Sequence, residues 1–199
     1  PGTVRTAQAK EAPQVNTAAS HPRPLDPQLA QIVSEHLNSY LDFPEPGILF
    51  RDFSPLLASG EPFQRLIRGL AEHYRGYINA VAGLESRGFI LSSTLAVELG
   101  IPMIMVRKAG KLPGDVIRTS YALEYGTASV EVAPATVNGL DRILVVDDLL
   151  ATGGTASASL ELLEKAGGHV VEIFALMELV DLGGRAALGD TPFQTLLQL

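Results

Sequence analysis

Two adjacent carboxylates, Asp147 and Asp148, are the side chains in this sequence best placed to do chemistry. They follow the apolar run ILVV at 143–146, whose β-branched residues predict a buried strand, and a loop at 149–155 leads from them into a helix. In an open α/β sheet, ligands bind beyond the carboxyl ends of the strands, where this pattern places both acids. The loop adds glycines, threonine hydroxyls and free amides at a helix N-terminus, which suit a phosphate dianion.

Turn geometry is the alternative explanation for this loop, because strand-to-helix turns often contain Gly, Thr and Asp only for capping. The adjacent acids favour a site, since two like charges at the mouth of a buried strand repel unless a sugar, a cation or a ligand hydroxyl satisfies them. Other phosphate motifs do not match: Gly110-Lys111 is followed by Leu112-Pro113, and no GxGxxG occurs. The sequence therefore disfavours both an ATPase loop and a dinucleotide-binding fold.

Strands and helices must alternate to position these residues. The predicted strands share near-continuous apolar runs and lie at 78–82, 103–106, 142–146 and 170–177. Helices are predicted at about 88–99 and 154–166, each closed by a glycine. This pattern predicts an α/β fold with a central parallel sheet flanked by helices on both faces. Two short strands around Gly126, at 118–124 and 128–133, predict an inserted β-hairpin.

The N-terminal part is predicted to be a tail and a small hood. Residues 1–24 lack apolar periodicity and predict a disordered tail, without the apolar stretch of a signal peptide. Asp26 and Pro27 begin a helix whose apolar residues continue at helical spacing to Leu41. The proline-rich segment 43–57 predicts an ordered loop, and Pro62 begins another helix. We expect a hood at about 25–60 within one domain over 25–199.

Composition excludes several classes of function. The chain carries 22 acidic and 15 basic side chains, a formal charge of −7 without a dense basic run, which disfavours nucleic acid and anionic membranes as partners. It has no cysteine, so thiolate metal sites and cysteine nucleophiles are excluded and a cytoplasmic location is expected. The histidines lack zinc-site spacing, and no apolar run approaches the ~20 residues of a membrane helix.

Five segments appear in the order found in the adenine phosphoribosyltransferase family, and the chain resembles that family over residues 43–155. They are FPEPGILFRDFSPLL (43–57), GLESRGF (83–89), RKAGKLPG (107–114), SYALEYG (120–126) and VVDDLLATGGT (145–155). The last looks like the phosphoribosyl-diphosphate motif of type I phosphoribosyltransferases. The resemblance implies that adenine N9 displaces diphosphate from C1′ of phosphoribosyl diphosphate to give AMP. It also implies a requirement for Mg²⁺, bound mainly through the substrate diphosphate, with no direct protein ligand predicted.

The phosphorylated substrate divides the implied site into two parts. The 5′-phosphate is expected in a cradle of loop residues, namely Ala151, Thr152, Gly153, Gly154 and Thr155. Asp147 and Asp148 accept hydrogen bonds from the ribose hydroxyls and offset positive charge at C1′. The leaving diphosphate is expected on the turn Glu85, Ser86, Arg87 and Gly88, with added positive charge from Arg107, Lys108 and Lys111. The alternative is a surface arginine beside a helix cap and solvated lysines.

The inserted hairpin, at about 108–133, is expected to act as a lid that keeps water from the ribosyl cation. Within it the resemblance makes Glu124 the general acid/base near adenine N7, with Tyr125 beside it. Without the resemblance, a glutamate on a short strand is more often solvated.

The resemblance places the adenine base against the segment around Leu49, Phe50 and Arg51, which is expected to sandwich the base and to read its edge with main-chain groups. The alternatives are that Phe50 belongs to the core and that Arg51 pairs with Asp52 or another acid. A homodimer is implied as well, in which a basic residue can reach across the interface.

Two other functions compete with this reading. One is phosphoribosyl transfer to another purine such as hypoxanthine or guanine, whose 6-oxo group accepts a hydrogen bond where the adenine amino group donates. The other is a regulator that keeps the fold as a ligand sensor without catalysis. Such regulators usually carry a basic DNA-binding module, and the 24-residue tail is too short and too poor in apolar residues to form one.

Overall fold

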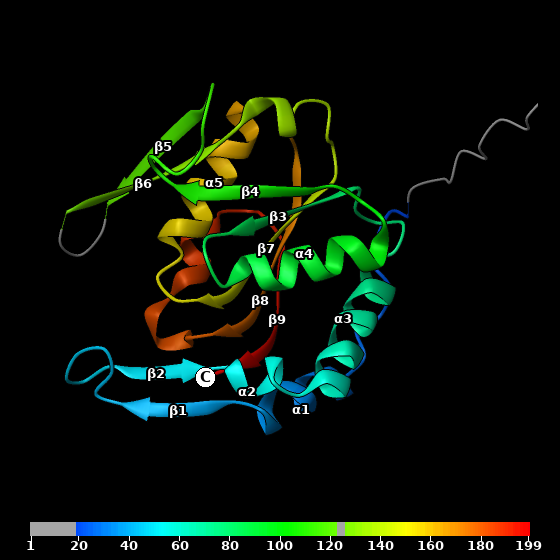
Figure 1. Cartoon of the computed structure of the whole chain (residues 1–199), viewed down its shortest axis with the longest axis vertical. Helices are drawn as coiled ribbons and strands as arrows, with labels where there is room; N and C mark the ends of the chain where they lie inside the picture. Colours follow the sequence, from blue (N-terminus) through cyan, green and yellow to red (C-terminus); the bar gives the residue numbers. More distant parts are fainter. Residues whose placement is uncertain (1–18, 123–125) are drawn as a thin grey trace, which may run out of the picture.

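A seven-stranded sheet forms the centre of the computed structural model, which describes residues 19–122 and 126–199 (Figure 1). Its strand order is β5-β6-β4-β3-β7-β8-β9. The strands are β3 (Ala80–Leu84), β4 (Met103–Lys108), β5 (Ile117–Ala122), β6 (Thr127–Val132), β7 (Ile143–Leu150), β8 (Val170–Glu178) and β9 (Phe193–Gln198). The five neighbouring strands β4, β3, β7, β8 and β9 run parallel to one another. β5 and β6 add an antiparallel hairpin beside β4. The predicted fold class and inserted hairpin are confirmed.

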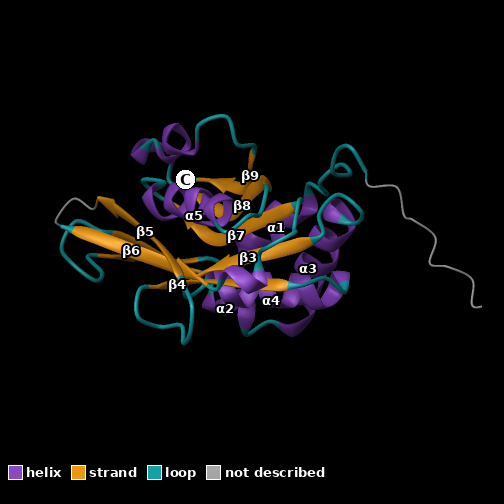
Figure 2. Cartoon of the chain, turned by 90° about the horizontal axis from the view of Figure 1, so that it is seen from above, coloured by secondary structure: helices purple, strands orange, loops and turns teal. Residues whose placement is uncertain are grey.

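Helices cover both faces of the sheet (Figure 2). α1 (Gln28–Glu35), α3 (Gly60–Tyr74) and α4 (Gly88–Leu99) pack on one face, and α5 (Gly154–Lys165) packs on the other. Along β3, Val81 joins the first core cluster, whereas Ala80 and Ala82 join the second. This alternation explains why the strands read as near-continuous apolar runs, since each residue meets a helix layer whichever way it points.

Two predictions for the N-terminal part were wrong. The helix predicted to continue to Leu41 ends at Glu35, because residues 38–41 form β1 (Asn38–Leu41), which pairs antiparallel with β2 (Leu49–Asp52). The segment 43–57 is not an irregular loop throughout, since it contains β2 and the short helix α2 (Ser54–Leu57). Its turn-forming residues gather at 44–47, and the β-prone sequence ILF that follows is free to pair.

The two ends of the described chain pack against neighbouring elements. Residues 1–18, most of the predicted tail, lie outside the described residues, while Ala19 and Arg23 donate backbone hydrogen bonds to carbonyls at the C-terminal end of α3.

After β8 the chain forms two 3₁₀ turns, η2 (Val180–Leu182) and η3 (Gly184–Leu188), before β9. Within the described ranges, no helix has the length and apolar character to cross a bilayer.

Candidate active site

Three adjoining hollows lie beyond the carboxyl ends of β3, β4 and β7. The first, about 90 Å³, is lined by the loop between β7 and α5, and the second, about 280 Å³, by the turn after β3 together with Lys108. The third, about 650 Å³, lies under the β1–β2 hairpin. Asp147 lines the first and second hollows, and Arg87 lines the second and third. The hollows therefore form one row from the phosphate-type loop to the hood.

The loop after β7 surrounds the first hollow. Its lining includes all five residues of the predicted cradle, Ala151, Thr152, Gly153, Gly154 and Thr155. Gly153 has φ +80°, and a Cβ built on it would lie 2.4 Å from the carbonyl oxygen of Gly184 in η3. Glycine is therefore required both by the backbone conformation and by the close approach of η3. The amides at the start of α5 follow directly, as an anion site needs.

The acid pair lies at the boundary between the first two hollows. Asp147 Oδ1 accepts a hydrogen bond of 2.9 Å from the backbone N–H of Asp148, and Asp148 Oδ2 lies 3.0 Å from Arg87 Nη2. Burial raises the pKa of Asp147 well above its usual range, and the neighbouring Asp148 raises it further. Burial also raises the pKa of Asp148, although Arg87 opposes that shift. Hydroxyl donors from a ribose would satisfy both carboxylates in their charged form.

The turn between β3 and α4 brings Arg87 to this pair. A Cβ on Gly88 would lie 2.7 Å from the Val146 carbonyl oxygen, so glycine lets the turn pack directly against β7. The Arg87 guanidinium also lies 5.3 Å from the centroid of the Phe50 ring. Arg87 therefore contacts both the acid pair and the hood. The alternative explanation, a surface arginine beside a helix cap, does not account for these two contacts.

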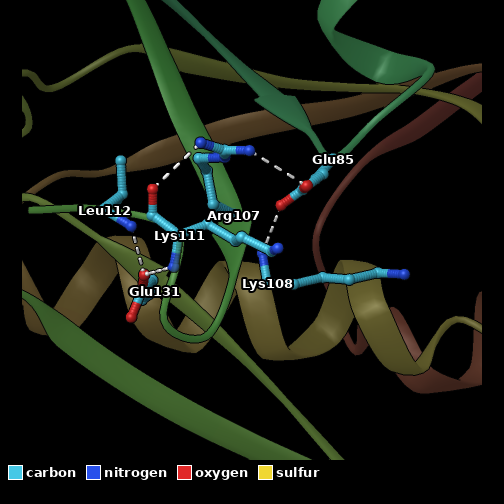
Figure 3. Close-up of polar contacts among 6 residues, drawn as sticks. All are labelled: Glu85, Arg107, Lys108, Lys111, Leu112 and Glu131. Atoms are coloured by element: carbon cyan, nitrogen blue, oxygen red, sulfur yellow. Dashed lines mark hydrogen bonds and ion pairs between the residues drawn. The ribbon is translucent and has the colours of Figure 1, made fainter.

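The predicted basic cluster divides into two kinds of residue (Figure 3). Arg107 is held internally, by Glu85 Oε1 at 3.2 Å and by the Lys111 carbonyl oxygen at 3.1 Å. Lys108 lines the second hollow together with Ser86 and Arg87. Lys111 contacts its surroundings through its backbone, donating to Glu131 Oε1 at 2.7 Å. Within residues 19–122 and 126–199, no acid pairs with Lys108 or Lys111, so these two supply the excess positive charge, whereas the Arg107 charge is matched by Glu85.

Glu85 fixes the backbone of this region. Its carboxylate accepts a 2.7 Å hydrogen bond from the Lys108 backbone N–H in addition to the contact with Arg107. Burial raises the pKa of Glu85, but these two partners outweigh it and hold the pKa below its usual value. Glu85 thus connects the turn after β3 to the end of β4 as an internal ion partner.

Strand alternation decides which hood residues reach the third hollow. Phe50 and Asp52 line it together with Tyr40 and Phe43, and the Phe43 and Phe50 rings meet edge to face at 5.1 Å. Leu49 and Arg51 alternate with these residues along β2 and are absent from the lining. Arg51 donates to Ser39 Oγ at 2.7 Å, on the paired strand, so its expected acidic partner is replaced by a serine. Phe50 is the member of the predicted trio that lines the pocket.

Sequence reasoning missed three residues beside the site. Tyr121 on β5 shares a hydrogen bond of 3.1 Å with Thr155 Oγ1, which joins the hairpin to the phosphate-type loop, and it lies in the quoted segment SYALEYG. Asp52 lines the third hollow, and its Oδ1 accepts the Ser54 N–H at the start of α2. Glu131 contacts the loop after β4 and carries no motif signal. Glu124 and Tyr125 lie outside the described residues.

The capacity of the same region to bind a metal ion depends on its carboxylates. Across residues 19–122 and 126–199, no group of three or more His, Asp or Glu side chains is arranged to hold a metal ion. The carboxylates among the residues that line the second hollow are those of Glu85, Asp147 and Asp148, and Glu85 is already paired with Arg107. A cation there would need most of its ligands from a bound molecule or from water.

Comparison with known proteins shows the family to which the chain belongs. A family model described as "Phosphoribosyl transferase domain" matches residues 57–186. The adenine phosphoribosyltransferase of Mastomys natalensis is 48% identical over 177 residues, covering 87% of this chain and 98% of that protein. The enzyme of the same name from Kineococcus radiotolerans is 49% identical over 166 residues, with 83% and 90% covered.

Solved structures of the same name share the fold. The adenine phosphoribosyltransferase of Saccharomyces cerevisiae, complexed with an imino-altritol bisphosphate and adenine, has a TM-score of 0.81 and 40% identity, covering 85% of this chain and 99% of that one. The Trypanosoma brucei protein, in complex with AMP, pyrophosphate and ribose-5-phosphate, has a TM-score of 0.77 and 26% identity, with 85% and 79% covered.

Proposed function

Because this chain belongs to the adenine phosphoribosyltransferase family, we propose that it transfers the 5-phosphoribosyl group from phosphoribosyl diphosphate to N9 of adenine, releasing AMP and diphosphate. The observation that carries the proposal is the row of three hollows with Asp147 and Arg87 at its two boundaries. In this proposal each hollow binds a different part of the substrates. The first is the cradle for the 5′-phosphate, the second holds the diphosphate at the cationic turn, and the third is an aromatic pocket for the base.

The acid pair suits the transition state of this transfer. Displacement at C1′ builds positive charge on the ribose ring, and carboxylates fixed nearby stabilise that charge more than they stabilise the neutral substrate. Asp147 and Asp148 lie between the phosphate cradle and the diphosphate turn, where the ribose of the substrate would lie. Arg87 and Lys108 would offset the charge of the departing diphosphate.

Mg²⁺ is included in the proposal as a companion of the substrate diphosphate. The carboxylates of Asp147 and Asp148, which face the second hollow, would contribute oxygen ligands or hold its water. When bound, the ion would neutralise charge on the diphosphate and make it a better leaving group. Arg87 and Lys108 would orient the diphosphate, and the acid pair would orient the ribose beside it.

The hairpin is proposed to act as a lid over the ribose. Its strands β5 and β6 lie beside α5, and Tyr121, one residue before the end of β5, contacts Thr155 of the cradle, so the turn end of the hairpin adjoins the proposed phosphate site. Glu124, in the segment SYALEYG, is assigned as the general acid/base at adenine N7, with Tyr125 beside it.

A homodimer and a cytoplasmic location complete the proposal. The exposed apolar side chains of Ile90 and Val97 on α4 and Met105 on β4 support a second copy as the partner of this face, with Val97 82% exposed. The lack of cysteine suits a reducing compartment.

Substrate choice tests the proposed reaction. With phosphoribosyl diphosphate and Mg²⁺, we expect AMP and diphosphate to form from adenine with a kcat/KM at least about 100-fold above that for hypoxanthine or guanine, because a pocket built for an amino donor leaves a group unpaired against a 6-oxo acceptor. Chromatography of the nucleotide products and a coupled diphosphate assay measure both. A preference for a 6-oxopurine would contradict the adenine assignment, and binding without diphosphate release would favour a ligand sensor.

Glu124→Ala tests the proton-transfer role. We expect kcat to fall by about 10²–10³-fold while the KM for phosphoribosyl diphosphate changes little, since removing a general acid/base slows chemistry more than binding. Steady-state kinetics with each substrate varied in turn measure the split. Glu164→Ala, at an exposed glutamate of α5, is the control. An unchanged kcat in Glu124→Ala would remove the assigned role.

A further inference from the structure

Glu131 is a fully buried carboxylate outside the three hollows, with 0% of the residue exposed. It lies on β6, the strand between β4 and β5, and it is in register with Arg107 on one neighbour and Arg118 on the other. Its neighbours Val130 and Val132 belong to the core cluster under α5, so Glu131 points to the opposite face of the hairpin. A charge buried in this way needs dedicated partners.

The partners come mainly from the loop that follows β4 (Figure 3). Glu131 Oε1 accepts hydrogen bonds of 2.7 Å from the backbone N–H groups of Lys111 and Leu112. Glu131 Oε2 lies 2.8 Å from Arg118 Nε. A hydrogen bond from the Gly110 backbone has the largest effect on the acid and, with the other donors, outweighs burial and lowers the pKa of Glu131 to about 2. The carboxylate therefore stays ionised and holds residues 110–112 across the working pH range.

The same loop is connected to the diphosphate turn by a second acid. The Lys111 carbonyl oxygen accepts from Arg107 Nη1 at 3.1 Å, and Arg107 Nη2 reaches Glu85 Oε1 at 3.2 Å. Glu85 precedes Ser86 and Arg87, which line the second hollow. Glu85 pairs with Arg107 and Glu131 pairs with Arg118, so among the described residues Lys108 and Lys111 carry the excess positive charge of segment 107–112.

We propose that Glu131 is a positioning residue for the diphosphate of the substrate, holding residues 110–112 so that the Lys108 and Lys111 charges stay beside the Arg87 turn; this rests on the proposed function. The carboxylate acts through the loop backbone and has no contact with the hollows themselves. Its loss should therefore weaken one substrate selectively.

Glu131→Gln is the test, since the amide keeps the size of the side chain but turns one oxygen acceptor into a donor facing other donors. We expect the KM for phosphoribosyl diphosphate to rise by about tenfold and the KM for adenine to stay within about twofold, as the loss of charged hydrogen bonds at one subsite predicts. Limited trypsin digestion of the folded protein, followed by mass spectrometry, should show cleavage after Lys108 and Lys111 several-fold faster than in the unaltered chain.

Glu172→Gln is the matched control, because Glu172 is a buried glutamate that accepts a hydrogen bond from Tyr74 away from the site. An unchanged KM for phosphoribosyl diphosphate in Glu131→Gln, or an equal rise in Glu172→Gln, would overturn the proposal. If Glu131→Gln does not fold, Glu131→Asp keeps the charge but shortens its reach, and the same selective KM rise is expected. If the chain makes no AMP, but phosphoribosyl diphosphate protects Lys108 and Lys111 from trypsin in the unaltered chain and not in Glu131→Gln, the proposed reaction is refuted while this role of Glu131 is supported.

Discussion

Asp147→Asn is expected to reduce kcat/KM by about 10²–10³-fold, the usual effect of removing one fixed group that stabilises transition-state charge. Asparagine has nearly the same shape and can still accept the Asp148 N–H at the Oδ1 position. It lacks the negative charge that faces C1′ in the proposed complex. Initial rates of AMP formation at varied phosphoribosyl diphosphate measure the loss.

The same substitution is expected to leave the fold intact and to raise its stability near neutral pH. The pKa of Asp147 is raised in the folded chain by burial and by Asp148, so the native state binds more protons than the unfolded state between the two pKa values. Native stability is therefore lost as pH rises from about 4, the unfolded pKa of an aspartate, through the folded value. Asparagine does not titrate and escapes this loss.

Thermal unfolding at two pH values checks that sign. We expect Asp147→Asn to unfold at a higher temperature than the unaltered chain at pH 7 and at the same temperature below the unfolded aspartate pKa. Asp190→Asn, at an exposed aspartate, is the control at both pH values. A lower Tm at pH 7 would show that the charged form of Asp147 contributes to folding and would contradict a pKa that folding raises.

The sheet could be predicted from sequence because its strands are buried on both faces. Ile143, Leu144 and Val145 lie in alternate core clusters, so the apolar run is continuous and its carboxyl end is marked by the first acid. Gly100, at φ +67°, ends α4 where it was expected. These are local signals, and the loop after β7 follows from them.

The hood could not be predicted in the same way, because β1 is exposed along its whole length. Tyr40 and Leu41 are apolar, but they belong to a two-stranded hairpin that leaves half or more of each side chain exposed. Their spacing from Ile32, Val33 and Leu37 matches a helix face only by coincidence. Once residues 38–41 and 49–52 pair, alternation sends Phe50 and Asp52 into the third hollow. The side chains of Leu49 and Arg51 alternate with these, so any part they take in binding the base falls to their main-chain groups.

Contacts between segments that are distant in the sequence could not be predicted from short sequence patterns either. Glu131 reads as a polar residue between two valines, and only the sheet register shows that it lies between Arg107 and Arg118. The hydrogen bond from Tyr121 to Thr155 spans 34 residues. Such pairs depend on how the hairpin is placed beside α5, which no short motif encodes.

Gly153→Ala is expected to have the other large effect, because the phosphate cradle rests on a segment of chain more than 30 residues away. The added Cβ would lie 2.4 Å from the Gly184 carbonyl oxygen and 2.9 Å from Ala187 Cβ. η3 cannot withdraw easily, since Arg185 makes two hydrogen bonds of 2.6 Å to Glu178 at the end of β8. The loop must move instead, and a displacement of about 1 Å at a reacting site can cost about 100-fold in rate.

Gly76→Ala separates this clash from the cost of the backbone conformation. Gly76 has the same φ of +80°, but a Cβ there meets nothing within 4 Å, and it lies after α3, away from the hollows. Both variants should lose about 1–2 kcal/mol of stability from the left-handed conformation. Only Gly153→Ala should also lose affinity for ribose 5-phosphate in calorimetry, by about 100-fold, together with kcat/KM for phosphoribosyl diphosphate. Equal affinity in the two variants would mean that the loop after β7 is not the receptor for the phosphate, because a cradle built from its amides cannot tolerate a displaced Gly153.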